Sequence, residues 1–112
     1  MNALVTGGNG FLGRAIVEQL LAQGSSVRVV GRNPYPELAA RGVACFRADL
    51  AAEDDVQAAL RGCDVVFHVA AKAGVWGSWD DFYRNNVTAT QHMLRASIRA
   101  GVPKFVYTSS PS

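Results

Sequence analysis

A run of glycines near the N-terminus is the part of this sequence that most directly suggests chemistry. Gly7, Gly10 and Gly13 are spaced three residues apart, between a short apolar segment and an amphipathic one. Glycine permits a tight turn, lets the backbone approach a ligand and lets a helix pack closely on a strand. A helix that begins here offers free N–H groups and the positive end of its dipole to an anion. The pattern therefore predicts a cradle for the pyrophosphate of a dinucleotide such as NAD(P).

Residues near the ends of the next two predicted strands are expected to contact the nucleoside half of such a cofactor. NAD enzymes of this build carry an acid at the end of the second strand, which binds the ribose 2′-hydroxyl. Here Gly31 stands at that place and Arg32 follows it. Because a guanidinium binds phosphate bidentately, we expect a preference for NADP(H) over NAD, with Arg14 assisting; the alternative is a solvated loop arginine. Asp49 either accepts the adenine amino group or caps the next helix, and both roles stay open.

Alternating apolar strands and amphipathic helices must position these residues. Hydrophobic periodicity and glycine stops predict strands at 2–6, 26–30, 43–47, 64–69 and 104–108, and helices at 11–23, 37–41, 51–60 and 79–99. This alternation predicts an α/β fold, a doubly wound parallel sheet with right-handed crossovers, as one domain over residues 1–112. The expected strand order is 3-2-1-4-5, with the ligand at the switch point between strands 1 and 4.

Composition excludes several other classes of protein. The chain has 112 residues and a net charge of +2, and its basic residues form no cluster that would bind nucleic acid. No apolar run reaches membrane-spanning length and no signal segment begins the chain, so we expect no membrane partner and a cytoplasmic location. Cys45 and Cys63 lack metal-ligand spacing to each other or to the histidines, so we expect both to be buried as small hydrophobes and expect no metal site.

Five motifs in fixed order connect the chain to a known family. They are Thr6-Gly7-x-x-Gly10-x-x-Gly13, Asp49-Leu50, His68-Val69-Ala70-Ala71, Asn86-Val87-Thr88-Ala89-Thr90 and Tyr107-Thr108-Ser109-Ser110. Together they resemble the extended short-chain dehydrogenase/reductase family, in the NAD-dependent epimerase/dehydratase superfamily, over the whole chain. Ala89 stands where the family usually has glycine. Residues 71–77 and 107–112 resemble its 3β-hydroxysteroid dehydrogenase-like branch, including bacterial reductases of 2-alkyl-3-oxoalkanoates.

The resemblance implies a set of site residues. Ser110 is implied as the catalytic residue whose hydroxyl holds a substrate carbonyl, with Ser109 as its substitute; the alternative is a polar pair that only ends a strand. Asn86 either supports the active-site region or lies on the surface, and Lys72 either approaches the phosphates or substrate or is an exposed loop residue. The implied cofactor-binding residues are Gly7, Gly10, Phe11, Leu12, Gly13, Arg32, Asp49, Leu50, Ala70, Ala71, Lys72, Asn86 and Ser109.

Three aromatic residues near these motifs admit more than one role. His68 lies inside an apolar strand, so a buried, hydrogen-bonded imidazole is expected rather than a catalytic acid or base. Trp76 and Trp79 line a substrate pocket, close the nicotinamide site or pack beneath another part of the protein, and the sequence does not separate these roles.

The resemblance also implies a reaction, namely hydride transfer between the nicotinamide and a ketone or secondary alcohol, such as a 3-oxoacyl or 3β-hydroxysteroid-like substrate. In the family, a Tyr-x-x-x-Lys pair donates the proton and holds the ribose. That pair is absent here, since the residues four positions after the tyrosines Tyr35, Tyr83 and Tyr107 are Ala39, Val87 and Pro111. We therefore expect the cofactor-binding part of an oxidoreductase that does not turn over substrate alone.

Two other functions and one mode of association remain open at this point. A non-catalytic NAD(P)-binding regulatory module would need no proton donor. A fragment of a nucleotide-sugar epimerase or dehydratase would usually carry an acid at the end of the second strand, which this sequence lacks. The expected partner is a small-molecule substrate of the full-length protein. The free edge of the last predicted strand also favours homo-oligomers or edge-to-edge association.

Overall fold

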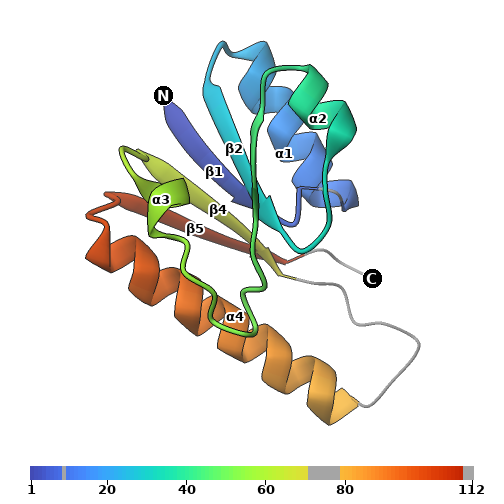
Figure 1. Cartoon of the computed structure of the whole chain (residues 1–112), viewed down its shortest axis with the longest axis vertical. Coiled ribbons are helices and arrows are strands. Elements are labelled where there is room, and N and C mark those ends of the chain that lie inside the picture. Colours follow the sequence, from blue (N-terminus) through green and yellow to red (C-terminus); the bar gives the residue numbers. More distant parts are fainter. Residues whose placement is uncertain (9, 71–78, 110–112) are drawn as a thin grey trace.

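The framework of the molecule is a five-stranded sheet with helices on both faces (Figure 1). A computed structural model describes residues 1–8, 10–70 and 79–109, with only the backbone described at 70, 79–84 and 109. The elements in chain order are β1 (Asn2–Thr6), α1 (Phe11–Ala22), β2 (Ser26–Gly31), α2 (Pro36–Ala40), β3 (Ala44–Arg47), α3 (Gln57–Leu60), β4 (Val65–Ala70), α4 (Trp79–Arg99) and β5 (Lys104–Ser109).

The strand order confirms the predicted doubly wound fold. The sheet runs β3-β2-β1-β4-β5, and every pair of neighbours is parallel. The pairing of Thr6 with Val30 on one side and with His68 on the other aligns the carboxyl ends of the three central strands. The chain leaves β1 toward β2 on one side and later returns to β4 on the other, so a crevice opens where these ends meet.

The apolar residues divide into two cores because side chains alternate across each strand. On the face covered by α1 and α2, Val5 and Val29 pack with Val17 and Leu38. On the face covered by α3 and α4, the core consists chiefly of Leu4, Val30, Val56, Leu60, Val66 and Met93. The central strands are buried on both faces, which explains their continuous apolar sequences. The two cores together hold the strand ends at fixed positions.

The predicted helix at 51–60 is wrong in its first half. Only Gln57–Leu60 is helical, and residues 51–53 form a turn. Side chains compete with the helix here, since Asp54 accepts from the backbone N–H of Asp49 and Glu53 adopts a φ of 57°. The acidic residues therefore do not occupy the first turn of a helix. A smaller correction concerns Ala70, which ends β4 rather than beginning the loop after it.

A third correction concerns the cysteines: Cys45 is exposed, contrary to the prediction, whereas Cys63 is buried as predicted. Cys45 lies on β3, which pairs only with β2 within the described residues and so has one open edge. Two further observations concern membrane spans and metal sites. None of the described helices is long and apolar enough to cross a membrane. Within the same part of the chain, no cluster of acidic residues, histidines and cysteines could hold a metal ion.

Candidate cofactor site

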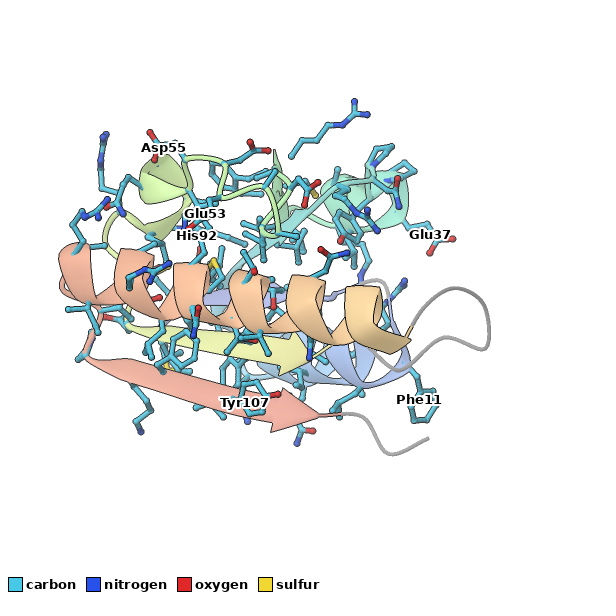
Figure 2. All side chains as sticks on the ribbon, turned by 90° about the horizontal axis from the view of Figure 1, so that it is seen from below. Phe11, Glu37, Glu53, Asp55, His92 and Tyr107 are labelled. Carbon is cyan, nitrogen blue, oxygen red and sulfur yellow. The ribbon has the colours of Figure 1, made fainter. Side chains whose placement is uncertain are left out.

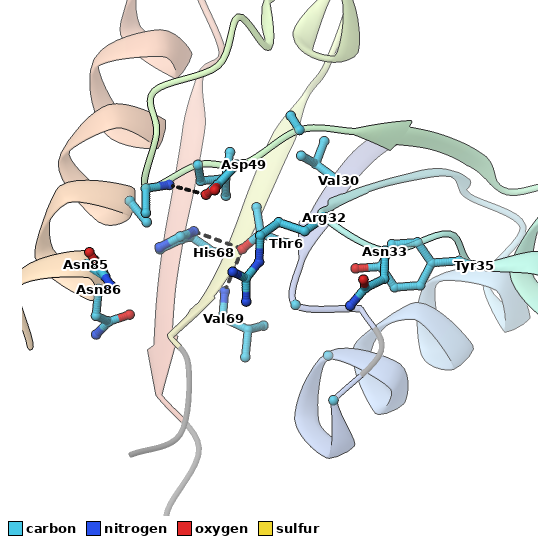
Figure 3. A pocket seen from close by; sticks show the side chains of 18 of the residues that line it. Thr6, Val30, Arg32, Asn33, Tyr35, Asp49, His68, Val69, Asn85 and Asn86 are labelled. Atoms are coloured by element: carbon cyan, nitrogen blue, oxygen red, sulfur yellow. Dashed lines mark hydrogen bonds between the residues drawn. The ribbon is translucent and has the colours of Figure 1, made fainter. Parts of the chain in front are cut away.

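A cavity of about 950 Å³ opens at the carboxyl ends of the central strands (Figure 3). Its walls come from the β1–α1 turn, the end of β2 and the residues after it, the segment that follows β3, the end of β4 and the middle of α4. This is the switch point of the sheet, where doubly wound folds bind their ligands, and the volume is in the range of small-molecule sites. The position of the cavity therefore agrees with the predicted nucleotide site.

The glycine turn is shaped by close backbone contacts. Gly7 has a φ of 70°, and its carbonyl accepts a hydrogen bond of 3.1 Å from the N–H of Gly10. A Cβ on Gly13 would lie 1.9 Å from the carbonyl oxygen of Gly7, so α1 can approach β1 this closely only with glycine there. A Cβ on Gly10 would meet that oxygen only at 3.5 Å, so Gly10 has room for a small side chain. Gly13 is thus required by the fold, and Gly10 keeps the cavity side of the turn open.

The first turn of α1 is free to receive an anion. Gly10 is its N-cap, no described side chain caps it, and its first turn contains no acidic residue. The first N–H groups of a helix have no partner within the helix, and the dipole favours a negative charge near them. Because Gly10, Phe11, Leu12 and Gly13 all line the cavity, this helix end and the glycine turn fit the pyrophosphate of a dinucleotide.

Arg32 lies at the opposite wall with an unpaired charge. It directly follows β2 and lines the cavity, and its carbonyl accepts a hydrogen bond of 3.1 Å from Nε of Arg47. Other arginines of the described chain form ion pairs, such as Arg95 with Glu53 at 3.1 Å, whereas Arg32 has no carboxylate partner there. Figure 3 shows its side chain extending over the cavity. The guanidinium is therefore available to an anionic ligand.

Arg14 does not assist Arg32 in this structure. Its Nη1 pairs with Oε2 of Glu37 at 3.3 Å, which turns the side chain toward α2. Gly31, where NAD enzymes carry an acid, has a different neighbour. A Cβ built on Gly31 would lie 2.0 Å from the hydroxyl oxygen of Tyr35. No side chain fits at position 31 while Tyr35 stays in place.

Asp49 serves as a cap, but for a turn rather than for the expected helix. Its Oδ1 accepts from the backbone N–H of Ala51 at 3.0 Å and, more weakly, from Ala52 at 3.4 Å. Its own N–H donates to Oδ2 of Asp54 at 2.7 Å. These bonds fix the segment after β3 against the cavity, which Asp49 and Leu50 both line. Because the capping bonds use only Oδ1, the second carboxylate oxygen of Asp49 is compatible with the proposed adenine contact.

The floor of the cavity is a chain of buried hydrogen bonds centred on His68. Its Nδ1 lies 2.8 Å from the Thr6 hydroxyl, and its Nε2 lies 3.0 Å from the Thr90 hydroxyl. The Thr90 hydroxyl donates its only proton to the carbonyl of Asn86, so it must accept from Nε2–H. The Thr6 hydroxyl accepts from the N–H of Val69 and donates to Nδ1. Every polar group of this hydrogen-bond network has a partner when the imidazole is neutral.

Burial keeps His68 in that neutral form. The residue is 3% exposed, and desolvation lowers the pKa of its imidazole to about 4. Its neighbours in the chain belong to β1, β4 and α4, so the imidazole connects three elements that line the cavity. As predicted, His68 is a buried and hydrogen-bonded residue; its bonds position Asn86 and the end of β1.

Many of the predicted site residues converge on this one cavity. Phe11, although it lines the opening, is 92% exposed and projects from the start of α1 (Figure 2). Ala70 and Ser109 end adjacent paired strands, β4 and β5. Ala71, Lys72, Trp76 and Ser110 lie outside the described residues. The predicted residues that line the cavity are Gly7, Gly10, Phe11, Leu12, Gly13, Arg32, Asp49, Leu50 and Asn86.

Three polar side chains of this site could not be identified from the sequence motifs. Tyr35, Asn33 and Asn85 line the cavity but belong to no motif. For Tyr35 a signal existed, since Gly31 ends a strand without a positive φ, and such a glycine often marks the close approach of another group. For Asn85, its place beside Asn86 on the same helix was the available signal.

Comparison with known proteins assigns the family. The profile of the NAD dependent epimerase/dehydratase family matches residues 3–112. The 2-alkyl-3-oxoalkanoate reductase of Stenotrophomonas maltophilia is 46% identical over 112 residues, which are all of this chain and 34% of that protein. A 3-beta-hydroxysteroid dehydrogenase of Mycolicibacterium neoaurum is 38% identical over 116 aligned positions, covering 97% of this chain and 32% of its own length. The chain thus spans about a third of the length of these relatives.

A solved structure agrees with this assignment. MoeE5 in complex with UDP-glucose and NAD superposes with a TM-score of 0.79 and 35% identity, over all of this chain and 37% of that one. The matched part is therefore the dinucleotide-binding fold that the cavity and the glycine turn describe. With the profile covering nearly every residue, the chain belongs to the NAD-dependent epimerase/dehydratase family.

Proposed function

We propose that this chain is the NADP(H)-binding part of an oxidoreductase that transfers a hydride between a nicotinamide and a ketone or secondary alcohol. The supporting observation is the unpaired guanidinium of Arg32 beside Gly31, at the strand end where an acid would select NAD. A phosphate monoester carries about two negative charges near neutral pH. An acid would repel this group, whereas a guanidinium binds it through charge-assisted hydrogen bonds.

The residues of the chain would bind and orient the cofactor. The cofactor supplies the hydride when it is bound, and the protein supplies position and electrostatics. The Gly7–Gly13 turn would hold the pyrophosphate, and Asp49 would accept the adenine amino group. The small side chains of Ala70 and Ala71 would let the ribose and phosphates pass close to the backbone. Lys72, Asn86 and Ser109 complete the proposed binding residues, and Ser110 would donate a hydrogen bond to a substrate carbonyl.

The names of the relatives guide the proposed substrate. A 3-oxoacyl compound or a 3β-hydroxysteroid-like alcohol is the class that we propose, since the two relatives described above act on 2-alkyl-3-oxoalkanoates and 3-beta-hydroxysteroids. The chain contains no Tyr-x-x-x-Lys pair to donate the proton. We therefore expect it to bind NADPH without oxidising it when a ketone is added. NADPH oxidation by the chain alone, followed by absorbance, would contradict this expectation.

The cofactor preference is tested by measuring dissociation constants for NADPH and NADH by isothermal titration calorimetry. We expect NADPH to bind at least about tenfold more tightly, because a charge-assisted hydrogen bond contributes about 1.5–3 kcal/mol. Arg32→Ala should remove most of this difference and leave NADH binding unchanged. Arg95→Ala is the matched control, since Arg95 is an exposed arginine outside the cavity. Equal affinities for the two cofactors would overturn the proposal.

A second candidate is the cofactor part of a nucleotide-sugar epimerase or dehydratase. The likeness to MoeE5, which was solved with UDP-glucose and NAD, favours it. It predicts a preference for NAD, and it predicts that the protein binds a UDP-sugar. The same two-cofactor titration therefore separates the candidates, and a preference for NADH would favour the second.

A further inference from the structure

Tyr35 is a cavity residue that the family motifs do not include. It follows β2 after a short loop and precedes α2, and it is only 9% exposed. It belongs to the core beneath α1 and α2, where it packs with Leu38 and Val43. Its carbonyl accepts a hydrogen bond of 2.9 Å from the N–H of Ala39, and this is the first backbone bond of α2, which begins at Pro36. The ring is therefore anchored on its core side, while the residue also lines the cavity.

The tip of this ring occupies the space beside Gly31. A Cβ on Gly31 would lie 2.0 Å from the hydroxyl oxygen of Tyr35, 2.9 Å from Cζ and 3.1 Å from Cε2. Atoms in a close-packed interior do not approach so closely, so residue 31 can carry a side chain only if Tyr35 moves. The first side-chain atom of a ribose-binding acid and the Tyr35 hydroxyl thus compete for one position.

The hydroxyl that fills this position has an unused donor. Among the described residues, the Tyr35 hydroxyl makes no hydrogen bond, although the residue is buried. Burial raises the pKa of Tyr35, so the hydroxyl keeps its proton at neutral pH. A protonated phenol can donate to a phosphate oxygen without adding charge. The hydroxyl is not among the buried polar atoms that lack a partner, so solvent in the cavity reaches it, and a ligand there can accept its proton.

We propose that Tyr35 is a second specificity-determining residue for the nucleotide: its hydroxyl excludes an acid from position 31 and donates a hydrogen bond to the 2′-phosphate of NADP(H). This inference rests on the proposed NADP(H) binding and adds a different interaction to it. Arg32 attracts the phosphate by charge, whereas Tyr35 blocks the geometry that an NAD enzyme uses. The two residues stand on either side of a short loop and both line the cavity.

The direct test is Tyr35→Phe, which keeps the ring in the core and removes only the hydroxyl. The probes are 2′,5′-ADP and 5′-AMP, which differ only in the 2′-phosphate, and their dissociation constants are measured by calorimetry. We expect affinity for 2′,5′-ADP to fall about fivefold to twentyfold and affinity for 5′-AMP to stay within about twofold, the size of one hydrogen bond to a charged group. The thermal unfolding midpoint should not fall. An unchanged ratio of the two affinities would overturn the inference.

A second test uses the competition for space. Gly31→Asp alone should weaken the fold and the binding of both NADPH and NADH, because the new side chain meets the Tyr35 hydroxyl. Gly31→Asp together with Tyr35→Phe should recover part of the lost stability, because the hydroxyl oxygen is removed while the ring stays in the core. This double variant should bind NADH more tightly than NADPH, since the acid then has more room. If Gly31→Asp alone bound NADH as well as the double variant does, the exclusion would be wrong.

The outcomes separate this inference from the proposed function. If the unmodified chain binds 2′,5′-ADP no better than 5′-AMP, the proposed NADP(H) preference fails and the inference fails with it. If the chain prefers 2′,5′-ADP and Arg32→Ala abolishes that preference, but Tyr35→Phe leaves it intact, only the inference fails. A loss of preference in both variants supports the two together.

Discussion

The floor of the cavity and the end lined by Arg32 and Tyr35, which we propose as its nucleoside end, differ in how their polar groups are paired. On the floor, His68 lies between two threonine hydroxyls, and every donor and acceptor of this hydrogen-bond network has a partner. At the nucleoside end, Arg32 has no carboxylate partner and the Tyr35 hydroxyl makes no hydrogen bond within the described residues. Saturated groups fix the shape of a site, whereas unsatisfied groups facing a cavity are available to a ligand.

This contrast predicts which substitutions damage the fold and which damage only binding. Residues of the floor and of the closely packed glycine turn should lower the free energy of unfolding when changed. Removing the guanidinium of Arg32 or the hydroxyl of Tyr35 should change affinity and leave stability almost intact. The glycine turn contains both kinds within one motif: a Cβ on Gly13 would clash with the Gly7 backbone, whereas a Cβ on Gly10 would make only an ordinary contact at 3.5 Å.

The largest effect is expected for Gly13→Ala. Its Cβ would lie 1.9 Å from the Gly7 carbonyl oxygen, so α1 must move away from β1. Overpacking against rigid backbone is expected to reduce the free energy of unfolding by about 3 kcal/mol, measured by urea denaturation. Gly10→Ala is the matched control; it should reduce stability by less than about 1 kcal/mol but weaken binding of 2′,5′-ADP. Equal destabilisation by the two substitutions would show that the turn is not closed in this way.

The parts of the molecule that follow periodicity could be predicted from the sequence. The continuous apolar segments and their glycine stops predict all five strands and the order of the sheet, since these depend on local patterns and general connection rules. The glycine motif, Arg32 and Asp49 were found because strand ends bring them to one edge. The site was therefore foreseeable to the extent that it is made of strand ends.

The remainder depends on contacts between residues that have no fixed spacing. Thr6 and His68 are 62 residues apart, and only the folded sheet places them in register. Tyr35 meets Gly31 because α2 turns the loop back onto β2, which no periodicity encodes. The missing half of the helix at 51–60 has a different, local origin, since the carboxylates of Asp49 and Asp54 bind nearby backbone N–H groups in a turn.

A pH titration sharpens the account of the cavity floor. The pKa of His68 is lowered from 6.5 to about 4 in the folded state. As the pH falls, this imidazole is therefore protonated in the unfolded chain at a higher pH than in the folded chain. The stability due to neutral His68 is fully present above about pH 6.5 and is lost as the pH falls toward 4. The loss should approach about 3 kcal/mol, at about 1.4 kcal/mol per pKa unit. It is measured as the free energy of unfolding in urea across this range.

Two variants, His68→Gln and His92→Gln, test whether the imidazole of His68 causes this loss of stability on acidification. His68→Gln should be less stable near neutral pH by about 1–3 kcal/mol, because a buried hydrogen bond is broken, and should lose less stability on acidification. His92→Gln, in which the replaced ring binds the carbonyl of Asp54 near the surface, should keep the pH dependence of the unmodified chain. A His68→Gln variant with the full acid dependence would mean that other groups control this range.

The smallest effect is expected at Asp49, where structure and binding share one side chain. In Asp49→Asn the amide oxygen can still cap the turn through the bonds to Ala51 and Ala52, so stability should change by less than about 0.5 kcal/mol. The second oxygen becomes an NH₂ group, which cannot accept from the adenine amino group. Affinity for 5′-AMP should therefore fall about threefold to tenfold, the size of one hydrogen bond. If the affinity stays the same while Asp49→Ala destabilises the fold, Asp49 only caps the turn, and the nucleoside end then relies on Arg32 and Tyr35 for its polar contacts.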